Sequence, residues 1–259
     1  ASWFSSPGAS SIQPFGEALA VGKRYETVNK KSKQKERMST IAFYPNKAAK
    51  GDGFNVFYPE AKKYIQFHAG VGAYGIDAMR MTGIVPVTEK RAAMAARRRQ
   101  VLDKLKELRT QYNTVAFFCH GWRTGMQFGF DLSTVKVLAK ELVTGAEFDP
   151  QVTLYSCSCG AGDNDGDGGF ADALRDELCK AGAEHSIVVA HTTAGHATSN
   201  PYVRMFEGQG SPVGGTGGSW IVAPKSELWD KWRKALSSTT LRFELTDGVE
   251  HIHRTLLAK

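Results

Sequence analysis

The sequence has no long hydrophobic run and few cysteines, and each of these absences excludes a class of protein. No stretch of about 18 apolar residues occurs in the 259 residues, so we expect no membrane span. The four cysteines, at positions 119, 157, 159 and 179, form no paired CxxC motifs and are too few for a disulfide-dense secreted scaffold. They predict a reducing compartment: the protein is cytoplasmic or is delivered into a cytoplasm.

Acidic residues are outnumbered, and the net charge of +7 is concentrated in two segments. Residues 22–37 carry seven Lys or Arg against two Glu, and residues 89–109 carry eight against three acidic residues. No aromatic residue interrupts 89–109, which disfavours binding of single-stranded nucleic acid. We interpret the two segments as a solvated tail and a solvated helix face, and we expect no nucleic-acid partner.

What remains is an ordinary globular composition, with 42% hydrophobic and 23% charged residues. We predict a basic, Ser- and Gly-rich tail over residues 1–37 and a single domain over residues 38–259. Strands are predicted at 38–45, 55–70, 114–119, 151–157, 186–191, 219–224 and 240–245. Helices are predicted at 89–112, 132–144, 169–181 and 225–238, and a long loop at 192–218. Near-continuous apolar strands that alternate with amphipathic helices predict an α/β, three-layer sandwich with a mainly parallel sheet.

Two of the predicted strands end in residues that can carry out chemistry. "TVAFFCHGW" leads into His120 and Gly121, and "VTLYSCSCGAG" leads into Cys157 and Cys159. The carboxyl ends of parallel strands meet at one edge of a sheet, where ligands bind. An imidazole beside a thiol is the minimal equipment for nucleophilic catalysis. Gly121 has no side chain, so its backbone N–H can approach a developing oxyanion.

The order of these motifs resembles the caspase-haemoglobinase superfamily, which includes caspases, separases, clostripain, gingipains and CHAT-type peptidases. "FFCHGW" is similar to its His-Gly motif and "LYSCSCG" to its Cys motif, and the resemblance covers roughly residues 110 to 200. It implies a caspase-like fold and a cysteine endopeptidase that cleaves polypeptides and requires no cofactor. His120 would be the acid/base and Cys157 the nucleophile. Cys159 is the alternative nucleophile, because Gly160 directly follows it.

Two other functions are alternatives to the peptidase. A catalytically inactive caspase-like module could serve as a structural or interaction component of a larger assembly. A serine hydrolase of the α/β-hydrolase type would need a G-x-S-x-G elbow, which the chain lacks.

An acidic loop follows the cysteines. Asp163, Asp165 and Asp167, followed by Gly168, match the first half of an EF-hand calcium loop. The twelfth position is Leu174 where an EF-hand has Glu, so the loop is not an EF-hand. Two interpretations stay open. The three carboxylates bind calcium, or they form a hydrated turn whose charge is favourable at the N-terminus of the next helix.

Overall fold

The computed structural model describes the central part of the chain. The described residues are 40–46, 53–67, 70–77, 87–163, 166–195, 200, 202–208 and 218–222. The predicted tail at 1–37, helix at 225–238 and strand at 240–245 lie outside these residues.

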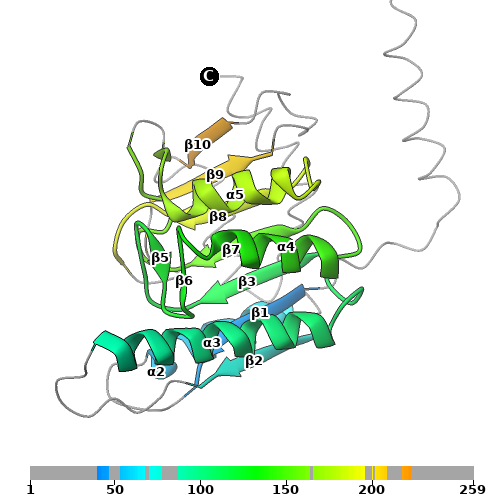
Figure 1. Ribbon diagram of the computed structural model, residues 1–259, viewed down its shortest axis with the longest axis vertical. Coiled ribbons are helices and arrows are strands. Elements are labelled where there is room, and N and C mark those ends of the chain that lie inside the picture. The colour runs from blue at the N-terminus through cyan, green and yellow to red at the C-terminus, as the bar shows by residue number, and fades with distance from the viewer. Residues whose placement is uncertain are drawn as a thin grey trace, which may run out of the picture. The chain divides into compact units, whose positions relative to one another are not determined.

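A seven-stranded sheet forms the centre of this region, in the order β10-β9-β8-β7-β3-β1-β2 (Figure 1). Its strands are β1 (Thr40–Pro45), β2 (Gly72–Ile76), β3 (Thr114–Phe118), β7 (Gln151–Tyr155), β8 (Ile187–His191), β9 (Val203–Glu207) and β10 (Gly218–Val222). Five neighbouring strands run parallel to one another: β2, β1, β3, β7 and β8. Strand β9 pairs antiparallel with β8, and β10 pairs antiparallel with β9. The sheet is therefore mixed and mostly parallel, as the sequence predicted.

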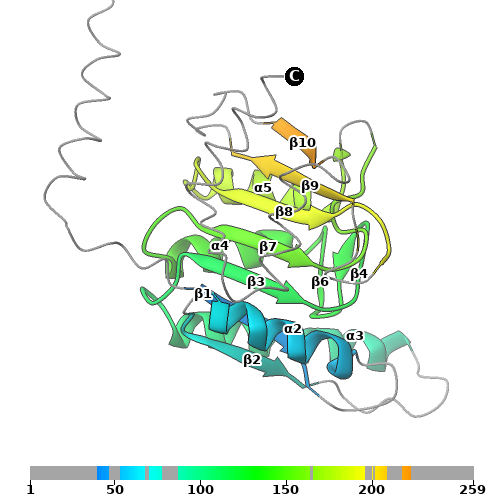
Figure 2. The same cartoon turned by 180° about the vertical axis from the view of Figure 1, so that it is seen from behind.

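Helices lie on both faces of the sheet. Helices α3 (Val87–Glu107), α4 (Val135–Gly145) and α5 (Phe170–Lys180) lie on one face (Figure 1), and α2 (Phe54–Phe67) lies on the other (Figure 2). The sequence of β3 is continuously apolar because both of its faces are buried. Phe117 belongs to the core cluster under α3 to α5, and Phe118 belongs to the cluster under α2. A strand buried on both faces has no polar side to show. The architecture is a three-layer α/β arrangement.

A small second sheet follows β3 directly. It consists of β4 (Gly121–Trp122), β5 (Gly125–Met126) and β6 (Phe130–Asp131), in antiparallel order β4-β5-β6. Gly129 has φ +83°, and a Cβ there would overlap the Met94 carbonyl of α3, so only glycine fits this turn. The close approach holds the small sheet against α3.

Three parts of the predicted secondary structure were wrong. Residues 55–70 were predicted as a strand, but Phe54–Phe67 forms α2, whose Phe57, Ala61 and Tyr64 share one buried face at helical spacing. Pro59 lies inside the helix and aromatic residues surround it, and both features are more typical of a strand or turn than of a helix. Strand β9 lies within the predicted loop at 192–218, and β2 and the small sheet were not predicted.

Among the described residues, no helix combines the length and the apolar character that crossing a membrane requires.

Candidate active site

The register of the sheet brings together the ends of the two strands that lead to His120 and Cys157. Strands β3 and β7 are parallel neighbours that pair Thr114 with Gln151 through to Phe118 with Tyr155, a constant offset of 37 residues. His120 and Cys157 have the same offset and lie two residues beyond the last pair. Neighbouring strands are about 4.8 Å apart. The two predicted catalytic residues therefore follow directly after neighbouring parallel strands, at the carboxyl edge of the sheet.

His120 is exposed and lies on the α2 side of the sheet. Its ring meets the ring of Phe57 edge-on, with the centroids 5.3 Å apart and an interplanar angle of 83°. A Cβ built on Gly53 would lie 3.1 Å from the His120 Nε2. The start of α2 thus forms one wall around the imidazole.

Gly121 fits directly against the cysteine turn. A Cβ at this position would lie 2.6 Å from the Sγ of Cys159, 2.7 Å from the Cβ of Ser156 and 2.8 Å from the carbonyl oxygen of Cys157. Separations under about 3 Å are far inside van der Waals contact. The absence of a side chain is what lets the His-Gly segment and the cysteine segment touch.

Cys157 begins a tight turn at the end of β7. The next residue, Ser158, has φ +57°, a left-handed conformation uncommon for a residue other than glycine. Its N–H donates to the carbonyl of Thr193 at 3.1 Å, and the half-buried thiol of Cys157 donates to the carbonyl of Gly195 at 3.4 Å. The loop after β8 therefore holds both residues, and in this conformation the thiol hydrogen bond is made to Gly195 rather than to His120.

The alternative nucleophile, Cys159, is placed very differently. It is fully buried in the core cluster under α3 to α5, and its thiol donates to the carbonyl of Gly125 at 3.5 Å. Burial, and secondarily the neighbouring Cys119, raises the pKa of Cys159 well above its ordinary value. Cys119 is also fully buried, and burial raises its pKa to about 12. Both are protonated near neutral pH and are shielded from a polypeptide.

The acidic loop contacts the hairpin that follows His120. The Asp163 carboxylate pairs with Arg123 Nη2 at 2.8 Å, and the Asp163 N–H donates to the Asp167 carbonyl at 2.8 Å. Asp165 lies outside the described residues, and among those that are described no group of three His, Cys, Asp or Glu side chains is arranged to hold a metal. The structure thus joins the backbones of two of the three predicted residues in one turn and leaves the calcium prediction without a test.

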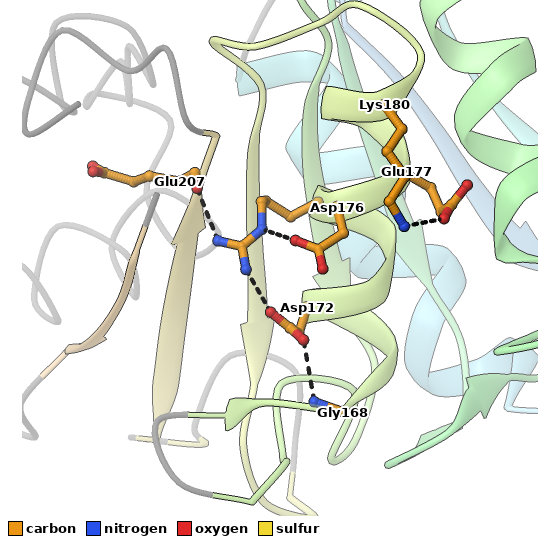
Figure 3. A network of polar contacts seen from close by, with 7 residues as sticks. Gly168, Asp172, Asp176, Glu177, Lys180 and Glu207 are labelled. Carbon is orange, nitrogen blue, oxygen red and sulfur yellow. Dashed lines mark hydrogen bonds and ion pairs between the residues drawn. The ribbon is translucent and has the colours of Figure 1, made fainter. Parts of the chain in front are cut away.

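A network around α5 anchors the other end of this loop (Figure 3). Arg175 pairs with Asp172 and Asp176 on its own helix and donates to the Glu207 carbonyl of β9 at 2.9 Å. Asp172 in turn accepts the N–H of Gly168 at 3.1 Å. The loop is therefore fastened to α5, and α5 to β9.

Residues outside the sequence motifs also shape the site. Gln127 hydrogen bonds to the backbone of His120. Asn200, which is 3% exposed, donates its amide to the carbonyl of Thr193 and so supports the loop that holds Cys157 and Ser158. Neither lies in a motif, so no sequence signal could have found them.

Comparison with known proteins adds no functional assignment. No protein-family model matches the sequence, and a search of curated proteins finds no match. Among solved structures, the chain is similar to GDP-mannose dehydrogenase from Pseudomonas aeruginosa, crystallised as a ternary complex, with 13% identity and a TM-score of 0.29. The similarity covers 61% of this chain and 37% of the dehydrogenase. So low a TM-score supports no argument about fold or activity.

Proposed function

We propose that the protein is a cysteine endopeptidase of caspase-like fold that cleaves polypeptides with a dyad of His120 and Cys157. The observation that supports the proposal is that His120 and Cys157 follow two paired parallel strands, each two residues beyond the last pair of the β3–β7 register. Cys157 is also the half-buried thiol of the cysteine turn, whereas Cys119 and Cys159 are fully buried. A nucleophile must reach its substrate, so this difference favours Cys157.

In the proposed reaction, His120 takes the thiol proton of Cys157, and the sulfur attacks the carbonyl carbon of a peptide bond. The carbonyl π electrons move to oxygen, and the Gly121 N–H donates to the resulting oxyanion. When the C–N bond breaks, the imidazolium returns its proton to the leaving amine. A water molecule, deprotonated by His120, then hydrolyses the thioester and releases the second product and the thiol. The cycle consumes one water and needs no cofactor.

The thiol must leave the Gly195 carbonyl before it can react with the imidazole. Rotation about the Cα–Cβ bond of Cys157, or a small shift of the loop after β8, would release it. Catalytic hydrogen bonds are often made only when substrate is bound.

The second candidate function is a catalytically inactive caspase-like module within a larger assembly. The Cys157–Gly195 hydrogen bond favours it, because this contact holds the thiol away from the dyad arrangement. In that case the pairing of β3 with β7 serves the fold and has no catalytic role.

Calcium binding by Asp163, Asp165 and Asp167 is a separate proposal for the acidic loop. It would serve stability and not the chemical steps. The ion pair with Arg123 competes for one of the three carboxylates.

The test is cleavage of a set of diverse unfolded polypeptides under reducing conditions, read by mass spectrometry. The wild-type protein and Cys159→Ala are expected to cleave, and Cys157→Ala to be inactive with little change in melting temperature. If Cys157→Ala cleaves while Cys159→Ala does not, the nucleophile is Cys159. If all three are equally inert, the inactive module is the better account.

A further inference from the structure

We infer that Gln127 is a positioning residue for His120, an inference that rests on the proposed dyad. The His120 N–H donates to the Gln127 side-chain Oε1 at 3.0 Å, and the Gln127 N–H donates to the His120 carbonyl at 2.9 Å. One residue therefore engages both backbone polar groups of the histidine.

These two hydrogen bonds, called the clamp below, hold His120 at a position that the hydrogen bonds of the main sheet do not reach. The ladder between β3 and β7 ends at the pair of Phe118 with Tyr155, so His120 lies beyond the last paired residue of its strand. Without another constraint, a residue at a strand end is free to rotate about its backbone dihedral angles. The two bonds to Gln127 fix the peptide planes on either side of His120, and with them the direction in which its side chain leaves the backbone.

Gln127 itself is held from several sides. Its neighbours Met126 and Phe128 are both buried in the larger core cluster. Its carbonyl accepts a hydrogen bond at 3.2 Å from Nη1 of Arg97, a partly buried residue of α3. The hairpin pairing of Gly121 with Met126 closes the short loop between the histidine and the glutamine. The residue that supplies the acceptor oxygen, Gln127, is thus anchored to α3 and to the core. Its hydrogen bonds restrict the backbone of His120, whose imidazole is exposed.

Phe57 provides the other half of the alignment. The edge-on contact between the rings limits the imidazole on its α2 side, and the clamp limits the backbone to which the imidazole is attached. With both constraints, the ring stays over the carboxyl edge where Cys157 lies. Displacement of a reacting group by about 1 Å can cost a factor of about 100 in rate.

The chain offers a matched control for general loosening of the hairpin. Nη1 of Arg98 donates to the carbonyl of Gly129 at 2.8 Å, which also ties the hairpin to α3. This contact lies two residues beyond Gln127, and no hydrogen bond links Arg98 to His120 among the described residues. Arg98→Met therefore removes an anchor of the hairpin and leaves the clamp intact.

The experiment measures the rate constant for alkylation of Cys157 by iodoacetamide across acidic, neutral and alkaline pH, with site occupancy read by mass spectrometry. This reaction needs no peptide substrate. The proteins compared are the wild type, His120→Ala, Gln127→Met, Gln127→Glu and Arg98→Met, each with its melting temperature. Methionine matches glutamine in length but lacks the acceptor oxygen, whereas glutamate keeps it.

We expect Gln127→Met to lower the neutral-pH rate constant by about 10- to 100-fold and to change the shape of the pH profile toward that of His120→Ala. Gln127→Glu and Arg98→Met are expected to stay close to the wild type. Should Gln127→Met fail to fold, Gln127→Asn, which withdraws the oxygen by one methylene, is expected to show the same loss.

Three outcomes would overturn the inference, and they separate it from the proposed function. If His120→Ala is slow but Gln127→Met matches the wild type, the dyad stands and Gln127 does not position it. If Arg98→Met or Gln127→Glu is as slow as Gln127→Met, the hairpin matters only as a whole. If His120→Ala reacts like the wild type, there is no dyad for Gln127 to position and the proposed function fails with it.

Discussion

The sulfur of Cys119 and the hydroxyl oxygen of Ser156 lie 3.2 Å apart, and each residue immediately precedes a member of the proposed dyad. Both are buried, so the contact fixes how the ends of β3 and β7 meet below the site. Because side chains alternate across a strand, a pair that faces inward at one position places the next pair on the opposite face. His120 accordingly lies on the side of α2, where its ring meets the ring of Phe57.

The first prediction concerns the glycine after the histidine. Gly121→Ala places a methyl group within 2.8 Å of atoms of Cys159, Ser156 and Cys157, and overpacking of this kind costs about 1–3 kcal/mol. We expect urea unfolding to show a loss of that size. A double variant that also carries Cys159→Ala should recover part of it, because one obstructing atom is gone. An unchanged unfolding free energy in Gly121→Ala would mean that the two segments are not in contact.

The second prediction concerns the order in which the thiols react. Limited iodoacetamide should label Cys157 well before Cys119 and Cys159, because the latter two are fully buried and their pKa values are raised by burial. Cys179, on α5, is only half-buried and should react at an intermediate rate. Peptide mapping by mass spectrometry measures the order. Labelling of Cys159 first would reverse the assignment of the nucleophile.

The third prediction concerns calcium at the acidic loop. If Asp163, Asp165 and Asp167 bind the ion, millimolar calcium should raise the melting temperature, because a ligand specific for the folded state stabilises it. Arg123→Gln should increase the shift, since it releases the Asp163 carboxylate from its ion pair. Asp163→Asn is the control and should abolish the shift. Identical melting curves with and without calcium in all three proteins would leave the hydrated turn as the account of this loop.

The fourth prediction concerns pH and the turn before α4. Asp131 accepts hydrogen bonds from the Ser133 N–H and from the hydroxyls of Ser133 and Thr134. Partial burial raises the pKa of Asp131, but these hydrogen bonds outweigh it and the net pKa is lowered. A carboxyl with a lowered folded-state pKa stabilises the protein above its unfolded-state pKa, and this contribution is lost as the pH falls through the folded-state pKa.

Asp131→Ala should therefore lower stability by up to about 1 kcal/mol near neutral pH, and the difference from the wild type should shrink in acid. Melting temperatures of both proteins across this range measure it. Asp131→Asn keeps an acceptor without the charge, so its difference from the wild type should be smaller near neutral pH and should also shrink in acid. A deficit in Asp131→Ala that stays constant into strong acid would contradict the assignment.

The sequence predicted the parts of the fold whose patterns are long and consistent. Strands β3, β7 and β8 are buried on both faces, so their apolar runs are continuous, and α4 and α5 bury one face at helical spacing. Helix α2 was missed because Pro59 and its aromatic neighbours are atypical of a helix. The two-residue strands of the small sheet are too short to show any period.

The candidate site divides in the same way. Because His120 and Cys157 follow strands that the sequence predicts, the parallel pairing of these strands could be foreseen. The burial that separates Cys157 from Cys159 depends on a turn at Ser158 and on packing against Gly125, which one sequence does not reveal. Gln127 binds the backbone of His120, and Gly195 binds Cys157 through its own backbone carbonyl, and contacts to backbone groups leave no signature in the sequence.

The most direct test of the dyad is the rate of Cys157 alkylation at neutral pH in the wild-type protein and in His120→Ala. General-base assistance of this kind contributes about 100-fold or more to enzymatic proton transfer, so a loss of at least about tenfold is expected when the imidazole is removed. The melting temperature of His120→Ala should stay close to that of the wild type, because the side chain is exposed. Equal rates in the two proteins would show that His120 does not act on Cys157, and the proposed peptidase mechanism would be wrong.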